Sequence, residues 1–238
     1  MPITTVLFDL DGTLLPMDYD LFLKAYFSRL AKAMAPLGYE PDALIQAVWK
    51  GTHAMVKNTG EKTNEEAFWD AFAAIYGEEC RAHIPQFDAF YRTEFQKIKE
   101  VCGFTPAAAE TVQFCKSAGL TVALATNPIF PMVATESRVQ WTGMDVSDFA
   151  LVTTYENSHF CKPNPDYYRE VCRRIGKTPE ECLMVGNDVG DDMVAGELGM
   201  SVFLLTDCLI NPQNVDIDQF PHGSFPQLMD HIRTLLAL

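Results

Sequence analysis

Two patterns of hydrophobic and polar positions divide this chain. Short apolar runs at residues 3–8, 120–125, 149–152, 183–186 and 202–205 predict buried strands. Around the later runs, apolar residues recur at helical spacing and predict helices at about residues 106–119, 131–141, 165–175 and 225–236, with a further helix that ends near Gly199. Because strands alternate with helices here, we expect a parallel sheet with both faces covered by helices.

Residues 16–100 follow the helical pattern throughout and are rich in aromatic residues. They predict four helices, and Thr63 with Glu66 resembles a capping box at the start of the third. The first strand belongs to the same sheet as the later ones, so this helical block interrupts the sheet-forming part of the chain. The sequence therefore predicts a doubly wound α/β core over residues 1–15 and 104–238, with an α-helical domain inserted over residues 16–103.

The charge and the cysteine content limit the cellular setting. The chain has 238 residues and a net charge of −14, which disfavours binding to nucleic acid or to an anionic membrane. No apolar run is long enough to span a bilayer, and the N-terminus lacks the basic start and long apolar stretch of a signal peptide. The seven cysteines include no Cys-x-x-Cys pair, which favours reduced thiols. We therefore expect a cytoplasmic protein, a monomer or small homo-oligomer, with no nucleic-acid or membrane partner.

Polar side chains cluster where the predicted strands end. The first strand ends at Asp9 and Asp11, which point to the same side of an extended chain because they are two residues apart. Ligands of parallel α/β sheets bind beyond the carboxyl ends of the strands. Each polar segment alone is typical of a turn, a helix cap or a solvated side chain. Four of them in this order favour a functional site: Asp9 and Asp11, Thr126 and Asn127, Lys162, and Asn187 with Asp188.

Together, these segments resemble the haloacid dehalogenase superfamily of phosphotransfer enzymes. The resemblance rests on Asp9-Leu10-Asp11-Gly12-Thr13, Thr126-Asn127, Lys162-Pro163 and Gly186-Asn187-Asp188-Val189-Gly190-Asp191-Asp192. It covers the whole predicted core, and the helical block corresponds to the cap that members of this superfamily carry between their first and second motifs. The resemblance implies a Rossmann-like core and an enzyme that acts on a small phosphorylated substrate.

The resemblance also implies a role for each residue of the site. Asp9 would be the nucleophile and form an aspartyl-phosphate. Asp11 would protonate the leaving alkoxide and then deprotonate the attacking water. Thr126 and Asn127 would bind the phosphoryl oxygens, and Lys162 would supply positive charge to the phosphate and to Asp9.

Magnesium is the cofactor that the resemblance implies. Its ligands would be the Asp9 carboxylate, the Asp11 backbone carbonyl and one acid of the fourth motif, all of them hard oxygen donors. Relatives often have Gly-Asp-x-x-x-Asp in this motif, whereas here Asn187 stands at the first acid position and Asp191 at the second. We assign the metal to Asp188 and keep Asn187 as the alternative ligand. Asp191 would either contact the metal ligands without binding the metal itself or position Lys162.

The sequence therefore predicts a magnesium-dependent phosphatase for a small phosphorylated metabolite, similar to phosphoglycolate phosphatases and nucleotidases. A sugar-phosphate mutase and a phosphonate hydrolase use the same core and remain alternatives, although no cap lysine is singled out for the imine that a phosphonate hydrolase needs. A dehalogenase is disfavoured because halide leaves without a proton, and those relatives usually lack the acid found here at Asp11. A catalytically inactive binding module is disfavoured because both acids, Thr126 and Lys162 are present.

Substrate choice should reside in the predicted cap, because a lid completes such a site when it closes. Helical spacing predicts that the cap aromatics, including Trp49, Phe68, Trp69 and Phe72, mostly pack in its core and do not contact substrate. Gly103, at one of the two connections to the core, is the candidate hinge residue.

Overall fold

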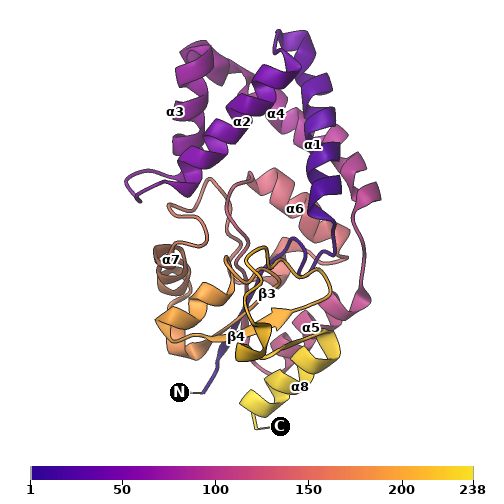
Figure 1. Cartoon of the computed structure of the whole chain (residues 1–238), viewed down its shortest axis with the longest axis vertical. Coiled ribbons are helices and arrows are strands. Elements are labelled where there is room, and N and C mark those ends of the chain that lie inside the picture. The colour runs from indigo at the N-terminus through magenta and orange to yellow at the C-terminus, as the bar shows by residue number, and fades with distance from the viewer. Residues whose placement is uncertain (1, 238) are drawn as a thin grey trace.

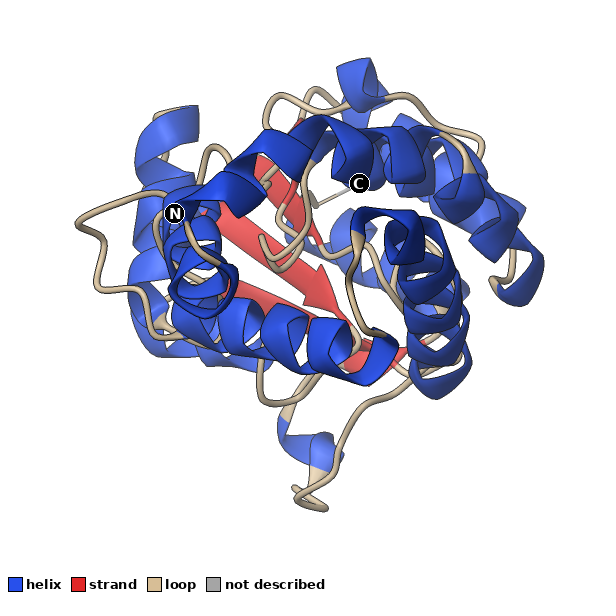
Figure 2. Ribbon diagram, turned by 90° about the horizontal axis from the view of Figure 1, so that it is seen from above, coloured by secondary structure: helices blue, strands red, loops and turns tan. Residues whose placement is uncertain are grey.

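The computed structural model describes residues 2–237 and contains a five-stranded parallel sheet. The strands are β1 (Thr5–Phe8), β2 (Thr121–Leu124), β3 (Cys182–Gly186), β4 (Ser201–Leu205) and β5 (His222–Gly223). They lie in the order β2-β1-β3-β4-β5, so β1 is placed between β2 and β3. Figure 2 shows the strands in red with helices around them. Every pairing is parallel, which confirms the doubly wound α/β fold predicted from the sequence.

Helices cover both faces of the sheet, and β1 contributes side chains to both because consecutive residues of a strand point to opposite faces. Val6 and Phe8 belong to a hydrophobic cluster that includes α5 (Pro106–Ser117) and α8 (Phe225–Leu235). Leu7, between them, belongs to a second cluster with α7 (Pro165–Ile175). Strand β1 is therefore fixed from both sides, which also fixes the residues that follow it.

Three elements differ from those predicted. The run at residues 149–152 forms a single bridge, from Val152 to Leu124, because its apolar pattern reflects burial of its side chains and not regular strand pairing. The predicted helix before Gly199 is a short 3₁₀ helix, Met193–Leu198. Strand β5 has two residues, too few to produce a hydrophobic pattern. Further 3₁₀ helices span Val146–Asp148, Pro179–Glu181 and Ile217–Gln219.

The residues between β1 and α5 form the predicted helical block, which lies above the sheet in Figure 1. It contains α1 (Tyr19–Met34), α2 (Pro41–Val56), α3 (Asn64–Tyr76) and α4 (Ile84–Arg92), with 3₁₀ helices at Ala35–Leu37, Glu78–His83 and Glu94–Val101. The capping box of Thr63 and Glu66 opens α3. Helix α6 (Met132–Trp141) lies between this block and the sheet (Figure 1). Among the described residues, no helix has the length and apolar character needed to cross a membrane.

Two segments connect the helical block to the sheet and lie side by side. Met17 and Cys102 form an antiparallel bridge, and the Gly103 N–H donates to the Pro16 carbonyl at 2.7 Å. A Cβ at Gly103 would lie 3.0 Å from Pro16, so glycine permits this close approach. The domain boundaries at 15/16 and 103/104 stay a prediction, and the terminal residues 1 and 238 of the predicted core lie outside the described residues.

The N-terminus of α3 holds the helical block against loops of the core. The Asn64 N–H donates to the Ser158 carbonyl and the Glu65 N–H to the Tyr155 carbonyl, both at 2.8 Å. The buried Asn64 side chain also donates to the Pro128 carbonyl at 3.2 Å. These contacts close the block over the loop that follows β2 and the loop that leads to Lys162.

Candidate active site

The ends of β1, β2 and β3 bring the predicted site residues together. These residues line one cavity of about 240 Å³: Asp9 and Asp11 after β1, Thr126 and Asn127 after β2, Asn187, Asp188 and Asp191 after β3, and Lys162 from the loop before α7. The cavity lies at the carboxyl edge of the sheet, where ligands of parallel α/β folds bind. The contacts of each residue then decide what it can do chemically.

Lys162 is held between two carboxylates. Its Nζ donates to Oδ1 of Asp9 at 2.8 Å and to Oδ1 of Asp192 at 2.6 Å, and its side chain is 1% exposed. Burial lowers the pKa of Lys162, but the Asp192 and Asp9 carboxylates outweigh burial and hold that pKa well above its ordinary value. Lys162 is therefore charged, and its charge lies against the predicted nucleophile.

The carboxylate that positions Lys162 is Asp192 and not Asp191, so one of the two roles predicted for Asp191 is wrong. Asp192 Oδ2 also accepts a hydrogen bond from the Asp188 backbone N–H at 3.0 Å. Asp191 makes a different contact, because its Oδ2 accepts a hydrogen bond from the Asn127 side chain at 3.2 Å. Asp192 can approach β3 because Gly186 has no side chain: a Cβ there would lie 2.0 Å from Asp192 Oδ2. This strand glycine is the sequence signal that could have identified Asp192.

The Asn187 side chain is occupied by contacts within the protein. Its Oδ1 accepts from the Thr13 hydroxyl at 2.9 Å, its Nδ2 donates to the Cys208 carbonyl at 2.7 Å, and the residue is 1% exposed. Gly12, with a φ of +85°, makes room for it, because a Cβ there would lie 2.3 Å from Asn187 Nδ2. Asp188 is half-buried at the same cavity, and its Oδ1 accepts the backbone N–H groups of Gly190 and Asp191 at 2.7 and 3.0 Å. Because Asp188 carries a negative charge that the Asn187 amide lacks, the arrangement favours Asp188 over Asn187 as the ligand of a cation.

Arg138 is a charged residue of the site that the motifs did not reveal. It lies on α6, is fully buried, and its guanidinium contacts Oδ2 of Asp11. The guanidinium also packs 4.3 Å from the centroid of the Phe130 ring, and Nε donates to the Ala134 carbonyl at 3.3 Å. Burial raises the pKa of Asp11 to about 6, while Arg138 lowers it and Asp9 raises it. The spacing of one helical turn from the buried Ala134 is the signal that could have placed Arg138 on the inward face.

Oδ1 of Asp11 is buried and has no hydrogen-bond partner among the described residues. Its other oxygen is held by Arg138, so the carboxyl group is fixed with one oxygen free. A buried polar atom without a partner is costly unless a ligand or water pairs with it. Asp11 is therefore suited to exchange a proton with an oxygen of a bound substrate or of a water.

Negative charge exceeds positive charge around this cavity, which is lined by five aspartates and one lysine. Burial raises the pKa of Asp191, Lys162 lowers it, and Asp188 and Asp9 raise it further. The described residues contain no group of three or more Asp, Glu, His or Cys side chains arranged to hold a metal. The predicted ligand set needs only two carboxylates, Asp9 and Asp188, beside the Asp11 backbone carbonyl. These oxygen donors and the surplus of negative charge fit a hard divalent cation such as Mg²⁺.

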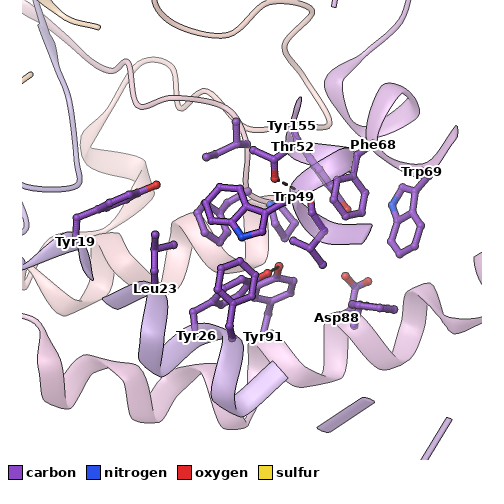
Figure 3. A pocket seen from close by; sticks show the side chains of 16 residues that line it. Tyr19, Leu23, Tyr26, Trp49, Thr52, Phe68, Trp69, Asp88, Tyr91 and Tyr155 are labelled. Carbon is purple, nitrogen blue, oxygen red and sulfur yellow. Dashed lines mark hydrogen bonds between the residues drawn. The ribbon is translucent and has the colours of Figure 1, made fainter. Parts of the chain in front are cut away.

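A second cavity, of about 50 Å³, adjoins the first and is lined mainly by the helical block (Figure 3). The residues that line both cavities are Tyr19, Ile129 and Phe130. The prediction that the cap aromatics mostly pack in its core holds for Phe72 and for Trp69, which belong to the hydrophobic core, although Trp69 also lines the cavity. Phe68 packs against that core and lines the cavity as well, whereas Trp49 lines the cavity and is 45% exposed. Helical spacing identified the inward faces of α2 and α3, but it could not tell whether those faces meet side chains or a cavity.

The parallel α/β fold places the acids and Lys162 at the carboxyl edge of its sheet, where proteins of this fold class bind their ligands. Residues 3–199 match the family described as haloacid dehalogenase-like hydrolase, so the chain belongs to this family. The family predicted from the motifs is therefore confirmed.

Individual relatives are more distant. The pyrophosphatase PpaX of Bacillus cereus (strain AH820) is 27% identical over 197 residues, which is 83% of this chain and 80% of PpaX. The structure of 2-haloacid dehalogenase from Pseudomonas syringae pv. tomato DC3000 gives a TM-score of 0.62 at 20% identity and covers 99% of this chain and 98% of that one. The structure of the HAD-hydrolase YfnB from Bacillus subtilis, described as bound to magnesium, gives a TM-score of 0.54 at 18% identity and covers 100% of both chains. The two structures show a shared fold and leave the substrate open.

Proposed function

We propose that this protein is a magnesium-dependent phosphatase that hydrolyses a small phosphorylated metabolite through an aspartyl-phosphate on Asp9. The observation that carries the proposal is the contact of the Asp9 carboxylate with the buried, charged Lys162. A fixed ammonium beside the nucleophile offsets the negative charge that arrives with the phosphate. Membership of a hydrolase family supports the reaction class, and the pyrophosphatase relative PpaX is named for cleavage of a phosphate bond.

The reaction begins when the Asp9 carboxylate attacks phosphorus and the bond from phosphorus to the alcohol oxygen breaks. Asp11, in its protonated form, gives its proton to the leaving alkoxide. Water then attacks the phosphorus of the aspartyl-phosphate and Asp11 accepts a proton from that water, so inorganic phosphate leaves and Asp9 is regenerated. The pKa of Asp11, raised to about 6, suits both transfers, and Arg138 holds its carboxyl in place.

The phosphoryl oxygens would be held by Thr126, by the backbone at Asn127 and by Lys162, which all line the cavity. Mg²⁺ on the predicted ligand set would offset the negative charge of those oxygens when bound. The closed position of the helical block over the cavity would limit the entry of water.

Metal dependence and the nucleophile can be tested together. Protein stripped of metal should release phosphate from phenyl phosphate and other simple esters only after Mg²⁺ is added, and chelation should abolish release. Asp9→Asn should remove activity, whereas Asp166→Asn, at an exposed aspartate on α7, should retain it. Absence of Mg²⁺-dependent release from every ester would contradict the proposal.

The metal ligand can be tested without turnover. Titration calorimetry with Mg²⁺ should show binding weakened by about tenfold or more in Asp188→Ala, a loss on the scale of removing a group that supports a metal site. Asn187→Ala should bind Mg²⁺ more nearly as the wild type does, because the Asn187 amide is used within the protein. The opposite order would assign the ligand to Asn187.

A further inference from the structure

The second cavity continues from the site of phosphate chemistry into the helical block. Because the two cavities share lining residues, a phosphate placed against Asp9 and Lys162 would direct its alcohol part past Tyr19 and Phe130 into the second cavity. The Tyr19 side chain lies at one end of the group drawn in Figure 3, and Asp88 lies toward the other. The chemistry of these walls therefore bears on which alcohol fits.

The walls of the second cavity are mostly apolar and aromatic. Rings from four helices and two loops face it, including those of Tyr26, Trp49, Phe68, Trp69, Tyr91 and Tyr155 (Figure 3). Its volume of about 50 Å³ is small, since a single water needs roughly 10–15 Å³ and a cavity that binds benzene has roughly 150 Å³. It has room for a short branched chain of about four carbons, and not for an aromatic ring or for a nucleobase with its ribose.

Positive charge is missing from these walls. No lysine, arginine or histidine lines the second cavity, and Lys162 is the single cationic residue that lines the first, among the residues that the structure describes. Lys162 is already paired with Asp9 and Asp192, and the nearby Arg138 is paired with Asp11. A second anionic group on the substrate would therefore find no cation to pair with.

Negative charge is present at the far end instead. Asp88 lines the second cavity. Glu65 and Glu156 do not line it, but both lie near enough to Asp88 for their charges to act on one another. Burial raises the pKa of Glu65, and the neighbouring Glu156 and Asp88 carboxylates raise it further. A substrate carboxylate or second phosphate would lose its hydration on entry and would also approach these acids.

We infer, on the basis of the proposed function, that the substrate is a phosphate monoester whose alcohol part is apolar, about the size of a short branched chain, and free of a second anionic group. Inorganic pyrophosphate, phosphoglycolate and nucleotides do not meet this description. The assignment thus separates this chain from the pyrophosphatase activity for which PpaX is named.

Three simple compounds test the assignment. Ethyl phosphate and phosphoglycolate have the same number of carbons and differ by one carboxylate, while isobutyl phosphate has a longer, branched alkyl part. We expect kcat/KM to be roughly tenfold or more higher for isobutyl phosphate than for ethyl phosphate, because the added carbons fill an apolar cavity. Phosphoglycolate should be worse than ethyl phosphate by about 100-fold, from loss of hydration and repulsion between like charges.

Two variants connect that preference to the cavity. Trp49→Ala, at a side chain that is 45% exposed and not needed for the core, should reduce kcat/KM for isobutyl phosphate about tenfold more than for ethyl phosphate. Ile75→Ala is the matched control, an exposed apolar residue of the helical block outside both cavities. Thr52→Lys places an ammonium in the cavity wall and should raise the ratio of phosphoglycolate to ethyl phosphate hydrolysis by roughly tenfold.

The outcomes distinguish this inference from the proposed function. Release of phosphate from none of these esters would overturn the phosphatase proposal and the substrate assignment with it. Faster hydrolysis of phosphoglycolate or inorganic pyrophosphate than of isobutyl phosphate would overturn the substrate assignment alone. The assignment would also fail if the ratios for Trp49→Ala and Thr52→Lys equalled those of Ile75→Ala.

Discussion

Replacement of Lys162 by methionine would leave two carboxylates, Asp9 and Asp192, without the ammonium that lies between them. The side chains of Lys162 and Asp192 are each 1% exposed and that of Asp9 is 10% exposed, so water cannot take over the role of the ammonium. Removal of one partner from a buried ion pair costs about 3–5 kcal/mol, because the other charge stays buried and uncompensated. A typical domain is stable by about 5–15 kcal/mol, so this single change should remove a large part of the free energy of unfolding.

The loss should depend on pH in a direction that the charges determine. Burial raises the pKa of Asp192 and Lys162 lowers it, so Lys162→Met should raise the pKa of this carboxyl further in the folded state. A carboxyl whose pKa is higher folded than unfolded stabilises the fold below its unfolded pKa, about 3.9, and loses that contribution as the pH rises through the folded value. Lys162→Met should therefore be destabilised less at pH 5 than at pH 8, relative to the wild type.

The assay is urea unfolding of metal-free protein at both pH values. Asp192→Asn in the Lys162→Met background should recover about 1–3 kcal/mol, the usual range of coupling between residues in contact. Arg169→Met is the control, since it breaks the exposed pair with Asp166 and should cost less than about 1 kcal/mol. The reasoning is refuted if Lys162→Met unfolds within about 1 kcal/mol of the wild type at pH 8, or if its loss is the same at both pH values.

Two further substitutions probe proton transfer. Asp11→Asn should lower phosphorylation of Asp9 by an alkyl phosphate by about 10²–10⁴-fold, and by less with an aryl phosphate, whose leaving group needs no proton. Phosphoenzyme should then accumulate in a rapid-quench assay, whereas Asp9→Asn should trap none, and the reverse pattern would exchange their roles. Arg138→Met frees the Asp11 carboxyl from its contact on α6, so kcat should fall more for alkyl than for aryl phosphates, with partial recovery in Arg138→Lys. Equal losses for the two ester types in Arg138→Met would reduce Arg138 to a packing role.

The arrangement of the strands could be predicted from the sequence because it depends on local patterns. A buried parallel strand has a short apolar run, and the first polar residues after it must lie at the carboxyl edge of the sheet. Asp9 and Thr126 were placed together by this rule alone, from positions far apart in the chain. The same rule does not apply to residues 149–152, because an apolar run records burial whether or not the backbone pairs regularly.

Contacts between helices and the site could not be predicted in the same way. Arg138 lies one turn beyond Ala134 on the inward face of α6, but its partner Asp11 is in the loop after β1, and the packing of α6 against that loop brings them together. Trp69 is on the inward face of α3 for the same geometric reason as Phe72, yet it also borders a cavity. Helical periodicity gives the direction of a side chain and not what it meets, so cavity walls and core residues share one signal.

Two glycines carry more information about the fourth motif than its acids do. Gly12 leaves the space that the Asn187 amide fills, and Gly186 leaves the space that the Asp192 carboxylate fills, with a Cβ excluded by 2.3 Å and 2.0 Å contacts respectively. A glycine at the end of a buried strand costs stability unless another group needs that close approach. Each glycine therefore marks a polar side chain committed to contacts within the protein, Asn187 to the loop after β1 and Asp192 to the lysine. Asp188 also uses one oxygen within the protein, since its Oδ1 accepts the backbone N–H groups of Gly190 and Asp191, but it keeps its charge and its second oxygen at the cavity. That charge is the physical reason to assign the cation to Asp188.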